Sequence, residues 1–255
     1  MANSLTPEHA RAEERAAGER DYLGRQVRRL DRIGRRARRI VRPRWLALHR
    51  TKPLSDTWSA RGKPVDRYYI ERFLEENRHL IRGSVLEIKQ SVYTDRFGAG
   101  VRRRDVLDAD PTNERATIVA DLTRADAVPS NSFDCFILTQ TLQYVFDVRA
   151  AISHCHRILR PGGVLLCTVP SVSRIEPGSL EREYWRFTGA SCRRLFVEAF
   201  GSSEVSVDTH GNVLSSIAFL AGLAREELGR RELDYEDEYF PLIVTVRATK
   251  AVEVA

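Results

Sequence analysis

Four acidic residues lie in or directly after short apolar runs, and their type and placement suit the binding of a polar ligand. They are Glu87, Asp105, Asp108 and Asp121. An ionised carboxylate has two oxygens that accept hydrogen bonds, so it suits a ligand with two neighbouring hydroxyl groups, such as a ribose. If the fold brings these carboxylates to one edge, the sequence predicts a binding site for a hydroxyl-bearing molecule there.

The apolar runs around these residues predict the strands of a sheet. Strands are expected at residues 84–88, 101–107, 117–120, 133–138, 164–169, 204–208 and 242–247. Helices are expected at 66–74, 147–159, 191–200 and 213–228, with Asp66 and Asp147 as N-caps of the first two. Strands that alternate with helices predict a single Rossmann-like, doubly wound α/β sheet of about seven strands. Such sheets bind ligands beyond the carboxyl ends of their strands.

Composition divides the chain into three parts. Residues 51–64 are rich in Pro, Ser and Gly, which is typical of a linker. Residues 1–50 are predicted as a basic helical N-terminal extension, and residues 65–255 as one domain. The whole chain has 41 Lys and Arg and 35 Asp and Glu, of which 14 and 6 lie in residues 1–50, so the remainder keeps 27 and 29. This near-neutral body lacks the basic footprint of a nucleic-acid-binding domain.

Residues 25–42 of the extension repeat apolar side chains every three or four positions among arginines, which predicts a basic amphipathic helix. Such a helix makes weak contact with a membrane surface, contacts nucleic acid, or packs on its own domain or on a second subunit of a homo-oligomer. The sequence favours packing and leaves the other two interpretations open.

The four cysteines are predicted to be reduced and buried. Cys135, Cys155, Cys167 and Cys192 lie in or beside apolar runs and show no C-x-x-C spacing, so neither a metal site nor a disulfide framework is predicted. The sequence has no apolar stretch of membrane-spanning length and no secretory leader at Met1, which predicts a cytoplasmic protein.

Residues 120–170 carry a collinear set of motifs. Asp121 follows the third expected strand, Phe133-Asp134 open the fourth, and the next helix ends in Leu-Arg-Pro-Gly-Gly at 159–163. This order resembles the second half of class I S-adenosylmethionine-dependent methyltransferases, and residues 85–88 (Val-Leu-Glu-Ile) resemble their first motif. The resemblance implies S-adenosyl-L-methionine as the cofactor and a Rossmann-like sheet with an antiparallel edge strand.

The loop after the first motif departs from that family. Glycines normally follow the acidic residue so that the backbone can approach the cofactor closely, but here the loop runs from Lys89 to Thr94, and Gly98 and Gly100 come later. The run of Tyr93, Thr94, Phe97 and Gly98 resembles a subgroup of bacterial methyltransferases associated with sugar and natural-product modification.

The resemblance implies roles for particular residues in cofactor binding. Glu87 orders the loop, Asp121 accepts a hydrogen bond from the adenine amino group, and an acid at the end of the second strand binds the ribose, with Asp105 as first choice and Asp108 as the alternative. The other implied contacts are Lys89, Gln90, Ser91, Thr94, Leu122, Thr139 and Gln140, with Arg67 and Tyr69 over the methionine end. Each also has a structural interpretation, as a surface charge, a turn residue, a polar strand end or a core tyrosine.

Candidate acceptor residues follow the fourth and fifth strands. Gln143 and Tyr144 are expected to face the acceptor, and Tyr184, Trp185 and Arg186 join two aromatic rings to a cation. Aromatic faces pack on sugar rings and Arg binds anionic groups, although the same segment also suits a packed lid. His210 follows the strand expected at 204–208, so it is the best-placed histidine for a general base, or else an ordinary loop residue.

These observations predict methyl transfer from S-adenosyl-L-methionine to an oxygen of a small-molecule or saccharide acceptor: a sugar, a glycan or a glycosylated metabolite. One alternative is a methyltransferase-like protein that has lost or repurposed catalysis and acts as a binding partner. A second alternative, a nucleic-acid methyltransferase, is disfavoured by the near-neutral body and by the lack of an Asn-Pro-Pro-Tyr type motif.

Overall fold

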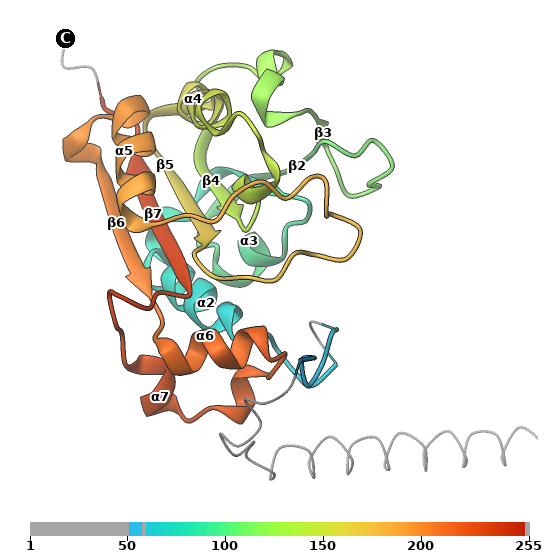
Figure 1. Ribbon diagram of the computed structural model, residues 1–255. Coiled ribbons are helices and arrows are strands. Elements are labelled where there is room, and N and C mark those ends of the chain that lie inside the picture. The colour runs from blue at the N-terminus through green and yellow to red at the C-terminus, as the bar shows by residue number, and fades with distance from the viewer. Residues whose placement is uncertain (1–50, 58–59, 253–255) are drawn as a thin grey trace, which may run out of the picture. The chain divides into compact units, whose positions relative to one another are not determined.

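The computed structural model describes residues 51–57 and 60–252, and the compact unit that carries the sheet begins at Lys52. Its centre is one seven-stranded sheet with the order β3-β2-β1-β4-β5-β7-β6 (Figure 1). The strands are β1 (Gly83–Ile88), β2 (Val101–Asp108), β3 (Ile118–Val119), β4 (Phe133–Thr139), β5 (Leu159–Pro170), β6 (Val205–His210) and β7 (Ile243–Thr249). Strands β1 to β5 pair in parallel, and β7 pairs antiparallel with β5 and β6. The predicted fold class is confirmed.

Helices cover both faces of this sheet (Figure 1). The α-helices are α2 (Asp66–Glu76), α3 (Val92–Phe97), α4 (Val148–Ile158), α5 (Gly189–Phe200), α6 (Val213–Leu220) and α7 (Arg230–Asp234). Short 3-10 helices lie at Arg78–Leu80, Leu122–Ala127, Leu142–Tyr144, Ser202–Glu204 and Arg225–Glu227. One core cluster joins α4 and α5 to the sheet, and the other joins α2, α3, α6 and α7 to it.

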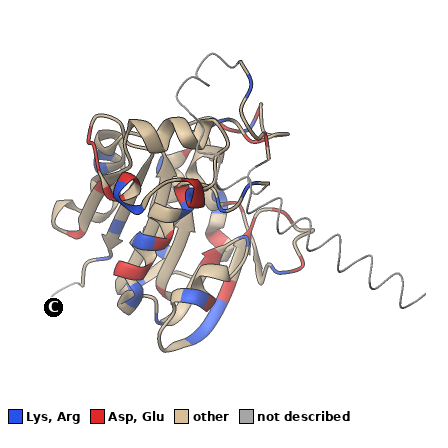
Figure 2. Ribbon diagram, turned by 90° about the horizontal axis from the view of Figure 1, so that it is seen from below, with Lys and Arg blue, Asp and Glu red and all other residues tan. Residues whose placement is uncertain are grey.

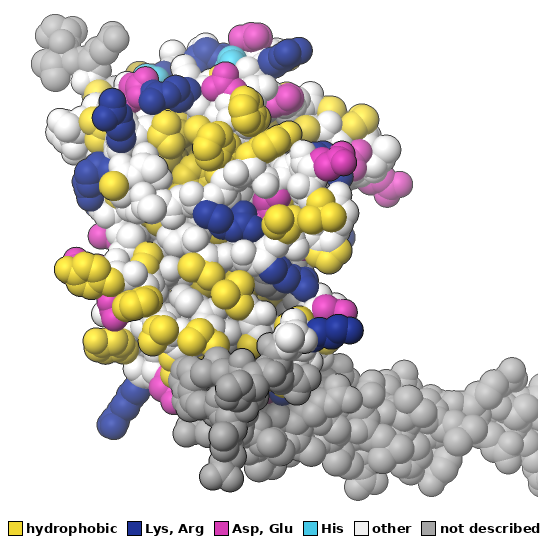
Figure 3. Space-filling model, in the orientation of Figure 1, with side chains coloured by type: hydrophobic (Ala, Val, Ile, Leu, Met, Phe, Trp, Pro, Cys, Tyr) yellow, Lys and Arg dark blue, Asp and Glu magenta, His cyan; other side chains and the backbone are white. Residues whose placement is uncertain are grey.

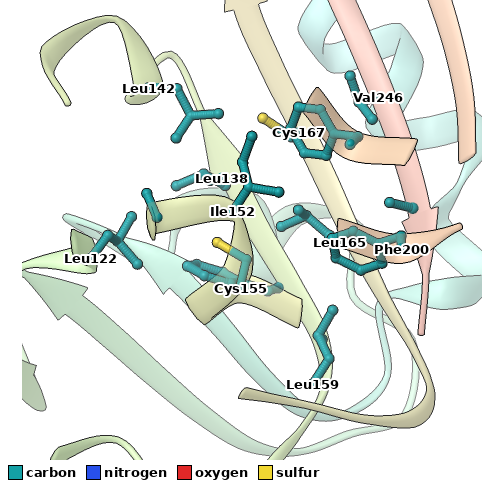
Figure 4. Close-up of a cluster of buried hydrophobic side chains, with 14 of the residues drawn as sticks. Leu122, Leu138, Leu142, Ile152, Cys155, Leu159, Leu165, Cys167, Phe200 and Val246 are labelled. Atoms are coloured by element: carbon teal, nitrogen blue, oxygen red, sulfur yellow. The ribbon is translucent and has the colours of Figure 1, made fainter. Parts of the chain in front are cut away.

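Alternation along β4 explains the two cores. Phe136 and Leu138 belong to the cluster under α4 and α5, whereas Cys135 and Ile137 belong to the cluster under α2 and α6. Successive side chains of a strand point to opposite faces, so an unbroken apolar run is required where both faces are covered. Figure 4 shows the first cluster, in which side chains from α4, α5 and the strands β4, β5 and β7 converge.

All four cysteines are reduced and buried, as predicted. Burial raises the pKa of each thiol, and that of Cys192 rises to about 12. Because the thiolate is the nucleophile, the native protein should not react with Ellman's reagent at pH 8, and all four thiols should react once urea unfolds it. Rapid release of thionitrobenzoate by the folded protein would contradict this packing.

The helix predicted at 213–228 is wrong, because α6 ends at Leu220. Gly222 adopts φ +75°, and a Cβ there would lie 2.0 Å from the carbonyl oxygen of Ser55, so the chain turns where only glycine fits. Of the two predicted N-caps, Asp147 accepts from the Ala150 amide at 3.0 Å, whereas Asp66 lies inside α2 after the cap residue Val65.

Several described residues of the segment predicted as a linker, residues 51–64, contact residues that follow α6. The Leu54 amide donates to the Ala221 carbonyl at 2.8 Å, Pro64 pairs with Ala224, and Arg61 forms an ion pair with Glu227. The lack of a side chain at Gly222 leaves room for the backbone of Ser55. The composition of residues 51–64 alone does not indicate this contact. The basic helix predicted at 25–42 lies outside the described residues.

Basic and acidic residues are interspersed along the described ribbon (Figure 2). The face in Figure 3 likewise mixes apolar, basic and acidic groups. Within residues 51–57 and 60–252, no helix has both the length and the apolar composition that a bilayer crossing requires.

Candidate active site

Polar side chains from four neighbouring strands meet at the carboxyl edge of the sheet. Glu87 is the penultimate residue of β1, Asp108 ends β2, Asp121 follows β3, and Gln140 follows β4. The chain leaves β1 into α3 on one face and leaves β4 toward α4 on the other, so the topology switches between these two strands. Ligands of doubly wound sheets bind in the crevice at such a point.

Glu87 anchors the segment that follows β1. Its side chain is 2% exposed, and its carboxylate accepts hydrogen bonds from the Tyr93 amide at 3.0 Å, the Thr94 amide at 2.7 Å and the Thr94 hydroxyl at 2.7 Å. Burial raises the pKa of this carboxyl, and the three donors oppose that rise. The buried carboxylate of Glu87 thus holds the first turn of α3 in the segment after β1, where methyltransferases of the resembled family normally have glycines.

Lys89 turns the chain at the end of β1 in a conformation that favours glycine. Its φ is +63°, its amide donates to the Leu107 carbonyl, and its own carbonyl accepts from Asn113 at 2.8 Å. The ammonium lies 5.9 Å from the centre of the Tyr144 ring. Gln90 and Ser91 follow, exposed and half-buried, and Ser91 is the N-cap residue of α3.

Substitution of Lys89 tests whether its backbone is strained. A left-handed residue with a Cβ costs about 1 kcal/mol relative to glycine, so Lys89→Gly should be more stable than Lys89→Ala by about that amount. Both variants lose the same side chain, so their difference isolates the backbone. Urea unfolding measures it, and equal stability of the two variants would contradict the strain.

Asp105, the first choice for the ribose position, lies inside β2 rather than at its end. β2 continues to Asp108, so Asp105 lies three residues before its end, where it contacts Arg103 and accepts from Thr117 at 3.0 Å. Asp108, the alternative, ends the strand and accepts from Asn113 at 2.8 Å. Asn113 therefore ties the end of β2 to the Lys89 turn.

Asp121 lies at the next strand end. It caps the 3-10 helix Leu122–Ala127, accepts from the Thr123 amide at 2.8 Å, and is exposed. The Leu122 side chain is buried in the core, which fixes the direction of this turn.

The carboxyl ends of β4 and β5 hold buried polar atoms that have no hydrogen-bond partner among the described residues. They are Nε2 of Gln140, Oε1 of Gln143 and Oγ1 of Thr168. Gln140 has φ +48°, donates its amide to the Thr168 carbonyl at 2.8 Å, and follows the half-buried Thr139. An unpaired buried polar atom costs free energy that a bound ligand can recover, so this cluster fits a polar ligand.

A long connection without regular structure, residues 171–188, runs from β5 to α5 across the carboxyl edge (Figure 1). The amides of Tyr184 and Trp185 donate to the Gln143 carbonyl at 2.8 and 3.3 Å, and the Trp185 indole donates to the Val145 carbonyl at 3.0 Å. Gln143, Tyr144, Tyr184 and Trp185 are therefore brought together, as the predicted acceptor site requires.

Phe146 completes this aromatic group, and sequence reasoning missed it. Its ring centre lies 5.3 Å from that of Tyr184 and 6.1 Å from that of Trp185. Phe146 is 69% exposed, Tyr184 47% and Trp185 38%, so three adjoining rings face solvent. The only signal in the sequence is an apolar residue directly before the cap Asp147.

The guanidinium of Arg186, predicted to face the acceptor, is engaged within its own connection. It donates to the carbonyls of Ser173, Arg174 and Trp185 and pairs with Glu183 at 2.8 Å. The Glu183 side chain is only 2% exposed. This ion pair closes the connection 171–188 on itself.

The first turn of α2 lies near α3 and near the segment that follows β4. Arg67 pairs with Asp66 at 3.1 Å, and its charge interacts with Tyr93 and Tyr144. Tyr69, by contrast, is buried and stacks on the His210 ring with centroids 6.2 Å apart. Tyr69 is therefore turned toward β6.

His210 ends β6, which is separated from β4 by β5 and β7. Its Nδ1 lies 2.9 Å from a Glu236 carboxylate oxygen and its Nε2 lies 3.0 Å from the Thr245 hydroxyl. Both ring nitrogens are engaged, and the structure does not bring this histidine to the crevice between β1 and β4.

Comparison with known proteins finds similarity to methyltransferases. A family model described as "Methyltransferase domain" matches residues 100–167, from just before β2 into β5. Phosphoethanolamine N-methyltransferase 2 of Haemonchus contortus, solved with S-adenosyl-L-methionine, is 14% identical with a TM-score of 0.50, over 82% of this chain and 56% of that chain. No curated protein matches the sequence significantly.

Two shorter structures align over nearly their whole length. A SAM-dependent methyltransferase from Archaeoglobus fulgidus is 11% identical with a TM-score of 0.48, over 74% of this chain and 96% of that one. An S-adenosylmethionine-dependent methyltransferase from Mesorhizobium loti is 14% identical with a TM-score of 0.46, over 73% and 98%. The sheet order and the comparison at a TM-score of 0.50 establish that this chain has the Rossmann-like fold of S-adenosylmethionine-dependent methyltransferases.

Proposed function

We propose that this protein transfers a methyl group from S-adenosyl-L-methionine to a hydroxyl oxygen of a saccharide, either a free sugar, a glycan end or a glycosylated metabolite. The observation that carries the proposal is the row of polar groups at the carboxyl ends of β1 to β4. Beside them lie buried amide and hydroxyl atoms that have no hydrogen-bond partner among the described residues. The fold and the matched methyltransferase model support S-adenosyl-L-methionine as the cofactor.

The residues of the edge fit an adenosyl amino acid by type. The Asp108 carboxylate suits the two ribose hydroxyls, and Asp121 keeps acceptor capacity for the adenine amino group. Arg67 and Lys89 supply positive charge for the amino-acid carboxylate, while Gln90, Ser91, Thr94, Leu122, Thr139 and Gln140 line the path between them. Glu87 contributes indirectly, because its oxygens already bind the amides of α3.

The three exposed rings of Phe146, Tyr184 and Trp185 support a saccharide acceptor. Aromatic faces pack on the C–H surface of sugar rings, and Tyr184 and Trp185 are held by hydrogen bonds to residues that follow β4. Gln143 Oε1 is a buried acceptor without a partner among the described residues, which suits a hydroxyl donor. Because methyl transfer is an in-line displacement, positioning of the hydroxyl is the main task of these side chains.

Transfer of a deuterated methyl group tests the proposal. The protein is incubated with trideuteromethyl S-adenosylmethionine and with hexoses, deoxyhexoses, hexuronic acids and their methyl glycosides and short oligomers, and products are read by mass spectrometry. We expect a labelled O-methyl saccharide and no transfer by the Asp108→Ala variant. Absence of any labelled saccharide would overturn the acceptor class.

A methyltransferase-like binding protein is the second candidate function. It is favoured by one observation: Lys89 and the capped turn of α3 occupy the chain segment where glycines are expected. The two candidates differ in cofactor affinity, because a protein that has lost catalysis need not bind S-adenosylhomocysteine.

A further inference from the structure

Asp66, the first residue of α2, is a buried carboxylate that neither the cofactor contacts nor the acceptor contacts proposed above use. It is 6% exposed, although aspartates are rarely buried unless paired. Oδ2 pairs with Arg67 at 3.1 Å, whereas Oδ1 has no hydrogen-bond partner among the described residues. A carboxylate oxygen that is buried without a donor is costly, which indicates a role other than stability.

The course of the chain places Asp66 at the carboxyl edge of the sheet. Helix α2 runs toward the short turn that precedes β1, so its first residues lie at the carboxyl edge and its last at the opposite edge. Glu71, one turn further along α2, pairs with Arg96 of α3 at 2.7 Å. Asp66 therefore lies at the carboxyl edge of the sheet, on the face that α3 also covers.

The charges that face Asp66 come from three elements. Arg67 and Glu71 lie on the same helix as Asp66. Tyr93 lies on α3, and its pKa is raised by burial and by the carboxylates of Asp66 and Glu71. Tyr144 follows β4 and interacts with Arg67. Burial raises the pKa of Asp66, and the positive charge of Arg67 and the backbone amides of Arg67 and Asp66 oppose this rise. Such a group of perturbed side chains in a crevice is characteristic of acid–base sites.

We propose that Asp66 is the general base of the methyl transfer, with Oδ1 as the atom that accepts the acceptor's proton. This role rests on the proposed function. As the acceptor oxygen forms its bond to the methyl carbon, its proton moves to Oδ1, the bond between sulfur and the methyl group breaks, and the electron pair of that bond stays on sulfur. Arg67 holds Asp66 through Oδ2, which leaves Oδ1 for the proton.

The position suits a base better than His210 does. Both His210 nitrogens have partners, and its strand β6 is separated from β4 by β5 and β7. Asp66, in contrast, keeps one buried carboxylate oxygen without a hydrogen-bond partner among the described residues. Removal of a general base typically costs a factor of about 100 or more.

Asp66→Asn keeps the shape of the side chain and removes the base. We expect kcat on the methylated saccharide to fall about 100-fold, with affinity for S-adenosylhomocysteine unchanged. In the wild type, kcat should decline as the pH falls through the Asp66 pKa, at a higher pH than an ordinary Asp with its pKa of about 3.9, and this decline should vanish in the variant. Glu76→Gln, at the exposed far end of the same helix, is the control and should leave kcat unchanged.

An infrared pH titration gives a readout that needs no acceptor. The wild-type minus Asp66→Asn difference spectrum should contain one carboxyl band that titrates above the ordinary range. Should the Asn variant fail to fold, Asp66→Glu should keep part of the activity with a shifted acidic limb.

The outcomes separate the two proposals. If the wild type methylates a saccharide and Asp66→Asn keeps the rate and pH profile, or if no titrating band appears, Asp66 is not the base and the proposed function stands. If the wild type methylates nothing, both fall.

Discussion

Replacing Glu87 by Gln should lower the free energy of unfolding by about 2 kcal/mol and weaken S-adenosylhomocysteine binding about tenfold or more. The carboxylate accepts three hydrogen bonds from Tyr93 and Thr94, whereas a Gln side chain offers one acceptor oxygen and turns an NH₂ group toward an N–H donor. With its anchor weakened, the first turn of α3 should no longer hold the loop after β1. Urea unfolding and calorimetric titration measure the two effects.

An exposed glutamate provides the matched control for this substitution. Glu114 lies in the loop between β2 and β3, so Glu114→Gln makes the same chemical change in solvent and should alter both quantities by no more than about 0.5 kcal/mol. If Glu87→Gln proved as stable as Glu114→Gln, the carboxylate would not be the anchor of α3.

The second large effect is expected for Arg186→Met. The change leaves the Glu183 carboxylate, whose side chain is 2% exposed, without its cation. It also removes the hydrogen bonds that Arg186 donates to the carbonyls of Ser173 and Arg174. A buried charge that loses its partner costs about 3 kcal/mol or more, so the connection 171–188 should open rather than bear that cost. Hydrogen exchange of the Glu176, Tyr184 and Trp185 amides should then accelerate about 100-fold, and methyl transfer should be lost with it.

Arg182→Met is the control within the same connection. Arg182 is exposed and donates to the Gly178 carbonyl at 3.3 Å, so its loss should leave amide exchange nearly unchanged. Equal exchange rates in the two variants would show that the ion pair of Arg186 does not close the connection.

Most of the fold could be predicted because each buried strand is a continuous apolar run. Strand β4, between two helical layers, has only two polar residues, Asp134 near its start and Thr139 at its end, whereas β3 is reduced to Ile118–Val119 and lies at the sheet edge. The helix prediction at 213–228 failed because a helical pattern does not reveal that Gly222 must admit Ser55. That requirement comes from tertiary contact between distant residues.

The site was predictable in kind and less so in detail. The strand ends bring polar side chains to one edge, but Asp105 and Asp108 are both acidic and both lie near the end of β2, so the sequence alone does not decide between them. Arg186 was expected to bind an anion because nothing local shows that backbone carbonyls would surround it. Asp66 is predicted from the sequence as a helix cap, because nothing local shows that its carboxylate is buried.

The proposed function requires an adenosyl cofactor to bind at the carboxyl edge despite the missing glycines. Calorimetric titration of the full chain with S-adenosylhomocysteine tests this most directly. We predict saturable binding with one site per chain, weakened about tenfold or more by Asp108→Ala, because a carboxylate that accepts two hydroxyls contributes about 1.4 kcal/mol or more. No heat of binding at millimolar ligand, or equal affinity in the wild type and in Asp108→Ala, would contradict the proposed cofactor site.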